Sequence, residues 1–483
     1  RSSPRIQADI DIDRLRYQQQ EIGNLSLEAT QFGDRKATSI RVNLSGANRL
    51  EAKGSYADQT GLIELRADLQ ELALATLDPF LEEYLDGSAG TLSGNILVDG
   101  PVGKPTVRGS IRLQNVSTLV KLANTRYAVA DHTIELDERK IDLGNLKLVD
   151  PEDRQASLSG LIRHDHFTRP EFDLNFRTDA FQFLHTQAKD NPLYYGDLFL
   201  RSTVAIRGPV DRPTIEIDAA TLPRSQLTVQ PFTEEQMLTQ EDYIVFANPA
   251  DYHPDSLYQI ERNISTAPNP FDLTLNLSLT PDARLKIIVD PETGDQLNCS
   301  GSANLTILME PSGELSVSGA YTIETGAYSF NYENLVKREF QIEKGSNIQF
   351  PGDPYQARFD ITAAYRTRAT TYELIKDQAT LSAAEVEASK KRSTVGVLLR
   401  LSGDLDQPEV SFDLEIPGES AGAVTSAVDQ KLRQLRDQPT ELNTQVFGLL
   451  FFNSFLSAEN NTLLTTAGEA AALSSVSRML SNQ

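Results

Sequence analysis

The sequence predicts a mainly β protein built as one elongated sheet with an apolar face. Three observations lead to this fold class: strand after strand alternates apolar and polar residues, one hairpin-turn signature recurs, and helical patterns are scarce before residue 418. The 483 residues are enough for two to four ordinary domains, but no break in composition divides them. Hydrophobic residues make up 39% and Trp is absent, which is lean for a large compact core and suits a thin sheet.

The charge balance excludes one class of partner. With 68 acidic and 45 basic residues, the formal net charge is -23. Nucleic acid binding depends on neutralising phosphates, so we expect no nucleic acid partner. Broad adsorption to anionic lipid headgroups is disfavoured for the same reason. The charge instead keeps a long sheet soluble and self-repelling.

Residues 1–269 predict a repetitive β-sheet region. The chain opens with "RSSPRIQADIDIDRL", in which Ile6, Ile10 and Ile12 alternate as in a strand. It has no initiator Met, no signal peptide and no run of ~18 apolar residues that could span a bilayer as a helix. We therefore expect the C-terminal portion of a longer protein, with any export signal or membrane anchor upstream.

A turn signature recurs three times at long intervals. It reads "GPVGKPTV" at 100–107, "GPVDRPTI" at 208–215 and "GDLDQPEV" at 403–410. In each copy Gly permits a positive φ, an apolar residue follows two positions later, and Pro five positions later fixes the exit from the turn. The signature predicts a hairpin unit that is reused along the sheet.

Helical patterns before residue 418 are few and weak. The first spans "ATLDPFLEEYLDGS" and comprises Leu77, Phe80, Leu81 and Tyr84 on one side, with Gly87 as a stop. The second is residues 233–247. The third, residues 372–391, is polar, and the sequence leaves open whether it forms a loose helix or a loop.

Residues 270–417 show the clearest alternation. Apolar side chains at every second position of a strand share one face of the sheet. This predicted apolar face comprises Leu273, Leu275, Leu277, Leu279, Leu285, Ile287, Val289, Leu305, Ile307, Phe359, Ile361, Tyr365, Val395, Val397, Leu399, Leu401, Val410, Phe412 and Leu414. Taken alone, these residues favour two sheets packed face to face over an open sheet.

The chain changes character in residues 418–483. Val424, Val428, Leu432 and Leu435 predict one face of an amphipathic helix, with Pro439 as a stop. The apolar segment "VFGLLFFNSFL", residues 446–456, is too short to span a bilayer as a helix but has about the length of a tilted strand in a membrane barrel. The tail predicts a further helix, whose inward face comprises Leu463, Leu464, Ala467, Ala471 and Leu473.

No constellation for catalysis, metal binding or a cofactor is visible. His164 and His166 would share a face of a strand, but no third ligand lies near, and a solvated strand edge is the favoured interpretation. The single cysteine, Cys299, predicts a buried, inert thiol. No P-loop, GxSxG or HExxH motif occurs. We therefore expect a protein that is not an enzyme, with no catalytic or metal-ligating residues and no cofactor.

Residues 319–375 resemble the C-terminal region of the TamB family, related to the AsmA-like proteins. The resemblance is carried by "SGAYTIETGAYSFNYENLVKREFQIEKGSNIQFPGDP" and the closing "DITAAY". Its elements are Gly319, Tyr321, Gly326, Tyr328, Phe330, Phe340, Ile342, Asp360, Ala363 and Tyr365. The specific similarity covers roughly residues 270–460. It divides the chain into a repetitive region (1–269), a conserved β-sheet (270–417) and a C-terminal helical region with an apolar segment (418–483).

The resemblance implies an open trough, or β-taco, in the periplasm of a Gram-negative bacterium. It implies an inner-membrane anchor through an N-terminal helix that this chain lacks, and an outer-membrane partner barrel of the BamA/TamA type. It attaches two roles to the family: conducting phospholipids, whose acyl chains the apolar face would hold, and assembling outer-membrane proteins. About 25 strands at ~4.8 Å would make a trough on the order of 120 Å long. The segment expected to meet the barrel comprises Val446, Phe447, Leu449, Leu450, Phe451, Phe452, Phe455 and Leu456.

Overall fold

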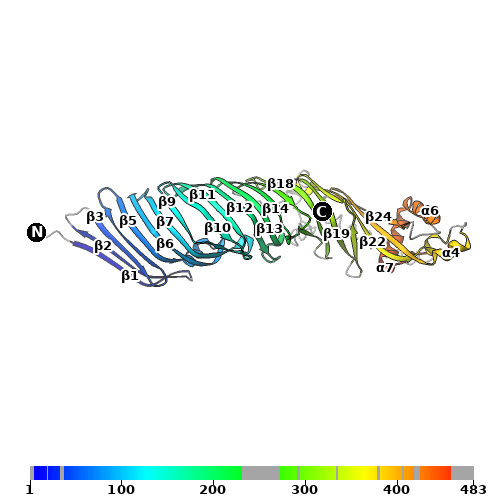
Figure 1. Cartoon of the computed structure of the whole chain (residues 1–483), viewed down its shortest axis with the longest axis horizontal. Coiled ribbons are helices and arrows are strands. Elements are labelled where there is room, and N and C mark those ends of the chain that lie inside the picture. The colour runs from blue at the N-terminus through cyan, green and yellow to red at the C-terminus, as the bar shows by residue number, and fades with distance from the viewer. Residues whose placement is uncertain are drawn as a thin grey trace, which may run out of the picture.

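Among the residues that the structure describes, one sheet of 24 strands forms most of the molecule, and short helices gather at its C-terminal end (Figure 1). The structure, a computed structural model, describes residues 5–18, 20–32, 37–230, 271–290, 294–332, 336–377, 381–404, 407–417 and 425–457. The first strands lie at one end of the molecule and the helices at the other. The mainly β fold class is therefore confirmed.

The N-terminal part of the sheet contains fifteen strands. They are β1 (Arg5–Tyr17), β2 (Gln20–Phe32), β3 (Ala37–Ser45), β4 (Arg49–Ala57), β5 (Leu62–Ala73), β6 (Leu85–Pro101), β7 (Thr106–Val120), β8 (Thr125–Val129), β9 (His132–Asp137), β10 (Lys140–Val149), β11 (Gln155–Asp165), β12 (Thr168–Thr186), β13 (Tyr194–Pro209), β14 (Thr214–Thr221) and β15 (Gln226–Val229). The helical pieces between them are η1 (Leu74–Leu77), α1 (Asp78–Leu81) and η2 (Lys121–Ala123).

The C-terminal part contains the remaining nine strands and the helices. The strands are β16 (Asp272–Leu279), β17 (Arg284–Asp290), β18 (Asp295–Met309), β19 (Leu315–Tyr332), β20 (Val336–Ile342), β21 (Asn347–Gly352), β22 (Arg358–Thr370), β23 (Arg392–Asp404) and β24 (Gln407–Glu415). The helices are η5 (Pro354–Gln356), α3 (Tyr372–Ile375), α4 (Ala383–Ser389), α6 (Thr425–Arg436) and α7 (Pro439–Phe452).

Neighbouring strands follow one another in chain order and pair antiparallel, with one exception. β14 pairs parallel with β16, and β15 pairs parallel with β17. Residues 230–271 connect the two pairs, and a connection of that length lets the chain return to the end of the sheet from which β14 started. Four pairs of strands lie end to end and share one position in the sheet: β8/β9, β14/β15, β16/β17 and β20/β21. At ~4.8 Å spacing the sheet is therefore about 90 Å long, shorter than the predicted trough.

The recurring turn signature joins consecutive antiparallel strands at all three sites. It connects β6 to β7, β13 to β14 and β23 to β24. Its glycines, Gly100, Gly208 and Gly403, have φ of +107°, +89° and +87°, which L side chains rarely adopt. The predicted hairpin unit is confirmed.

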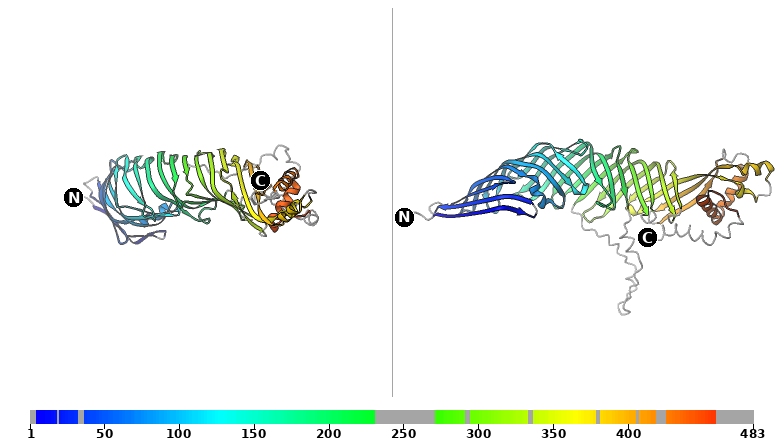
Figure 2. Two further views of the ribbon diagram at one scale, coloured as in Figure 1. Left: turned by 45° about the vertical axis from the view of Figure 1, so that its right-hand side comes forward. Right: turned by 90° about the horizontal axis from the view of Figure 1, so that it is seen from below.

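The sheet curves about the long axis of the molecule and forms an open trough (Figure 2). Apolar residues oppose one another across its ladders and share the less exposed face, which we call the inner face. Strand twist and register shifts supply the curvature. β12, for example, contains two such shifts against β13, between Thr178 and Phe181 and between Gln182 and Leu184. Gly160 of β11 lets strands approach closely, since a Cβ there would lie 2.1 Å from the carbonyl oxygen of Asp173.

The structure agrees with some of the predicted helices and differs from others. The first weak pattern forms only η1 and α1, and residues 372–391 contain two short helices, α3 and α4. The predicted amphipathic helix is α6, but Pro439 does more than end it, because it is the first residue of α7. Residues 233–247, Val424 and the tail helix lie outside the described residues. Within the described part of the chain, the helices lack the length and apolar character needed to cross a membrane.

Candidate functional site

The candidate site is the inner face of the trough, which is mainly apolar, with polar residues such as Thr178 and Ser202 at a few positions. Directly opposed residues of neighbouring strands lie on the same face, so the register traces the surface. One row comprises Ile10, Leu27, Val42, Ala52, Ala67 and Ile96. Another, at mid-sheet, comprises Val204, Ile217, Leu275, Ile307 and Val317. No polar side chain interrupts either row.

The inner face of the N-terminal and middle strands is incompletely buried. Leu65, Leu158 and Leu275 are half-buried, and Ile10 and Ile12 retain 51% and 39% exposure. A soluble monomer rarely leaves contiguous apolar surface larger than a few hundred Å2 without using it. The trough is therefore a surface that fits an apolar ligand along most of its length.

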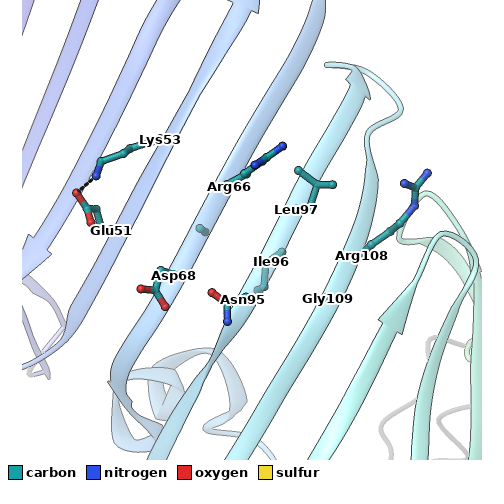
Figure 3. A pocket seen from close by; sticks show the side chains of 10 residues that line it. Glu51, Lys53, Arg66, Asp68, Asn95, Ile96, Leu97, Arg108 and Gly109 are labelled. Carbon is teal, nitrogen blue, oxygen red and sulfur yellow. Dashed lines mark ion pairs between the residues drawn. The ribbon is translucent and has the colours of Figure 1, made fainter.

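The outer face carries charges of both signs. Cross-strand pairs such as Arg41–Glu28 (3.0 Å), Arg163–Asp173 (2.9 Å) and Arg358–Asp404 (3.0 Å) recur along it. A shallow pocket of about 550 Å3 lies over β4–β7, lined by Glu51, Lys53, Arg66, Asp68 and Arg108 among others (Figure 3). Its acidic and basic groups alternate, and Glu51 pairs with Lys53 at 2.5 Å. The arrangement solvates the sheet and offers no converging nucleophile and base.

A second pocket, of about 590 Å3, is organised around the aromatic ring of Phe199. The guanidinium carbons of Arg154 and Arg224 lie 4.3 and 5.2 Å from its centroid. Arg224 donates two hydrogen bonds of 2.9 Å to Glu152, and these lower the pKa of Glu152 and raise that of Arg224. Since the charges are satisfied within the cluster, it clamps the 150–154 and 222–225 turns to β13.

His164 and His166 do not share a solvated strand edge, so that interpretation is wrong. His164 is 7% exposed, its ring stacks on Phe167, and its Nδ1 accepts a 3.2 Å hydrogen bond from the Phe167 amide. Burial, and next the charge of His166, lower the pKa of His164. His166 lies in the turn after β11, with Nδ1 3.0 Å from the Pro105 carbonyl oxygen. Among the described residues, no group of three or more potential ligands could hold a metal.

Cys299 is buried on β18, as predicted. Its Sγ lies 3.7 Å from the Tyr321 hydroxyl, and burial raises the pKa of the thiol to about 11. At neutral pH the thiol is protonated and therefore a poor nucleophile.

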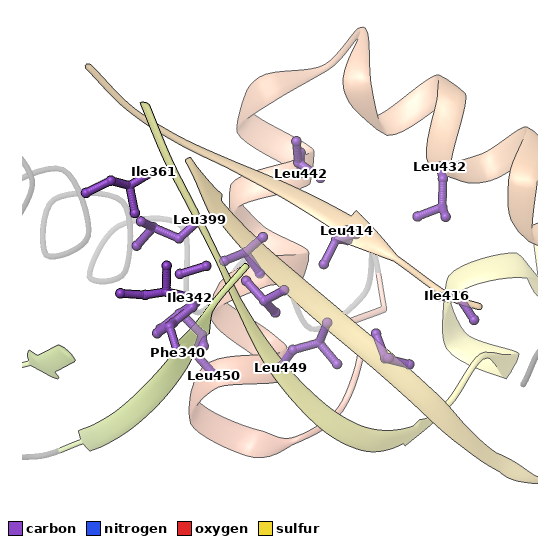
Figure 4. Close-up of a cluster of buried hydrophobic side chains, with 14 of the residues drawn as sticks. Phe340, Ile342, Ile361, Leu399, Leu414, Ile416, Leu432, Leu442, Leu449 and Leu450 are labelled. Atoms are coloured by element: carbon purple, nitrogen blue, oxygen red, sulfur yellow. The ribbon is translucent and has the colours of Figure 1, made fainter. Parts of the chain in front are cut away.

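At the C-terminal end, helices α6 and α7 cover the same inner face (Figure 4). Val395, Val397 and Leu414 are fully buried there, and Ile361 and Leu399 are nearly so. They pack in one cluster with Val428 and Leu435 of α6 and with Leu449 of α7. The predicted apolar face thus has two environments, half-buried in the trough and enclosed beneath the helices.

The other predicted residues of the face lie between these extremes. Leu273, Leu275, Leu277 and Ile307 are half-buried in the trough. Residues that pack against the edge of the buried cluster are Leu279, Leu285, Ile287, Leu305, Phe359, Tyr365, Leu401 and Phe412. Val289 and Val410 belong to β17 and β24, but their side chains lie outside the described part of the molecule.

The apolar segment 446–456 is mainly helical, and the comparison with a barrel strand is wrong. Most of it belongs to α7. Leu442, Val446 and Leu449 repeat at helical spacing, and all three are buried against the apolar face at the C-terminal end of the sheet. Val446, Leu449, Leu450 and Phe455 are buried against the sheet. Phe447, Phe451 and Leu456 are half-buried, and Phe452 is 55% exposed. Phe452 is therefore the one large apolar side chain of this segment that is exposed.

Sequence reasoning missed the trough residues before residue 270. Leu27, Leu65, Ile96, Leu158 and Phe176 belong to the same inner face. Their signal was the same alternation, as in "LIELRADL" and "QASLSGLI". Polar spacing residues and frequent glycines weakened it.

Comparison with known families gives a match over most of the chain. The family model of the TamB C-terminal domain matches residues 144–483, from within β10 through the C-terminal helices. A comparison with curated proteins finds no match.

Proposed function

The chain belongs to the TamB family, and from this premise we propose that it conducts phospholipids along the trough between the inner and outer membranes. The family acts in the bacterial envelope, in the module that transports and assembles outer-membrane components with a TamA-type partner. For this chain, the periplasm is the proposed location and phospholipid acyl chains are the proposed ligand.

The observation that supports the proposal is the long, mainly apolar face, on which many side chains such as Leu65, Leu158 and Leu275 are only half-buried. Each acyl CH2 removed from water contributes about 0.8 kcal/mol, so a chain of about 16 carbons gains on the order of 10 kcal/mol. The rows of Leu, Ile and Val change little from strand to strand, so a bound chain meets similar contacts at successive positions. Headgroups stay in water at the open seam.

The experiment is mass spectrometry of lipids that co-purify with the chain without detergent. Leu158→Asp places a carboxylate on the inner face, opposite Leu146 and Phe176. Ser157→Asp, its matched control, adds the same charge on the outer face between Lys147 and Arg177. Lipid bound to the wild type and to Ser157→Asp, and lost from folded Leu158→Asp, supports the proposal. Lipid absent from all three contradicts it.

An alternative function is assembly of outer-membrane proteins by strand pairing at the partner barrel. Among the described residues, β24 pairs on one side only, with β23, and an edge strand can accept a further strand. Phe452 lies exposed at the end of the neighbouring helix. Phe452→Asp should release a co-purified barrel partner, whereas Asn443→Asp, also exposed on α7, should retain it. Retention by both variants would argue against this contact.

A further inference from the structure

The apolar face extends beneath α6 and α7. Tyr365, Val397 and Leu414 are directly opposed across β22, β23 and β24. Ala363 connects this region back to Ile342 of β20. The buried surface under the helices is therefore the last segment of the trough. It has the same residue types as the open part, and its residues lie on the same face of the sheet.

The two helices are held on that face mainly by side-chain packing. The ladders between β22 and β23 and between β23 and β24 are formed by the strands alone, so none of this backbone pairing depends on α6 or α7. The packing is apolar, and apolar contact is non-directional. α7 is also apolar on its outer side, where Phe447 and Phe451 stack at 4.1 Å.

Polar contacts among the described residues also hold the helices in place. Tyr365 and Thr367 donate hydrogen bonds of 3.0 and 2.9 Å to Asn453, just after α7. Arg338 donates to the Leu450 carbonyl at 2.7 Å, and Arg436 of α6 pairs with Asp413 of β24 at 3.0 Å. Half-exposed contacts of this kind stabilise a docked helix only weakly.

We propose that the face beneath α6 and α7 is a cryptic acyl-chain site, which the two helices fill until they are displaced. Helix side chains and acyl chains cover this face by the same apolar contact, so one can replace the other. The inference rests on the proposed function of the trough, because it extends the same ligand class to a segment that is closed in this state.

A disulfide that locks α7 tests the proposal. Thr367→Cys and Asn453→Cys, in a Cys299→Ala background, replace two side chains that meet at 2.9 Å. A photoreactive benzoylphenylalanine replaces either Phe412, at the edge of the closed segment, or Phe176, in the open trough. The chain is mixed with phosphatidylethanolamine/phosphatidylglycerol vesicles and irradiated with the disulfide oxidised or reduced.

Lipid crosslinking at position 412 should fall about tenfold on oxidation, while crosslinking at position 176 stays unchanged. In the chain without the two introduced cysteines, Arg436→Ala with Asn453→Gly should raise crosslinking at 412 above that of the same chain with Arg436 and Asn453. Gly keeps the left-handed conformation of position 453 but removes the hydrogen bonds from Tyr365 and Thr367. Equal crosslinking at 412 in both redox states, or none there in either while 176 reacts, overturns the inference. No crosslinking at 176 overturns the proposed function instead.

Discussion

The open trough and its covered C-terminal end use the same apolar pattern for different purposes. At β16 the face remains half-buried, as Leu275 shows, whereas Val397 of β23 is fully buried. The residue types and the alternation are alike, and only the covering helices differ. An alternating strand therefore specifies an apolar face, but the partner of that face decides whether it is a core or a binding surface.

The largest expected difference between the regions comes from adding a charge. Val397→Asp should lower the local free energy of unfolding by about 4 kcal/mol or more, because the carboxylate would be enclosed without a partner. Leu158→Asp should cost about 1 kcal/mol, because its carboxylate can reach water at the open face. Hydrogen exchange of β23 and β11 amides measures both. Equal losses would mean that the trough is as closed as the capped end.

A smaller difference should follow truncation. Leu449→Ala, in the fully buried part of α7, should destabilise the capped end by about 3 kcal/mol through lost burial and a residual cavity. Leu275→Ala should cost about 1 kcal/mol, because its side chain is half-buried and leaves no enclosed cavity. Exchange rates of α7 and β16 amides report the two effects. A cost at Leu275 that matched Leu449 would place it in a closed core.

The pH response of Cys299 locates the boundary between the regions. Its pKa is raised to about 11 from 9.0 in the unfolded chain, so the folded state holds the proton more tightly. Stability is complete below about pH 9 and should fall by about 2 kcal/mol as pH rises to about 11. Denaturant unfolding across that range, with Cys299→Ala as the non-titrating control, isolates the effect. An identical pH profile for both proteins would indicate an open face at β18.

The smallest effect concerns the polar contacts of the helices. Arg436→Ala removes the ion pair with Asp413. It should lower the free energy of opening of α6, measured by hydrogen exchange, by no more than about 1 kcal/mol. Arg433→Ala removes an exposed arginine one turn earlier and should change it little. A loss of several kcal/mol at Arg436 would show that the helices are held by charge more than by packing.

The sequence predicted much of the fold, because strand alternation and turn chemistry are local. The hairpins at Gly100, Gly208 and Gly403 could be predicted from a glycine that permits a positive φ and from a following proline. Helix α6 could be predicted from the helical spacing of its apolar residues. The parallel junction and the cover over Val397 were not predictable in this way, since both depend on contacts between distant segments. The 446–456 segment was misjudged because an apolar run carries no period that separates a buried helix from a strand.

The parallel junction has a directional consequence for the whole molecule. When each two strands that share a position are counted once, the sheet has an even number of positions. In a wholly antiparallel sheet of that kind, the last strand would run opposite to the first. The pairing of β14 with β16 reverses that parity, so β24 runs in the same direction as β1. The chain therefore leaves the sheet at the rim at which β1 ends. This rim also carries the connection between β22 and β23, and α3 contacts α6. A single change of strand direction in mid-sheet thus selects the side from which the helices reach the trough.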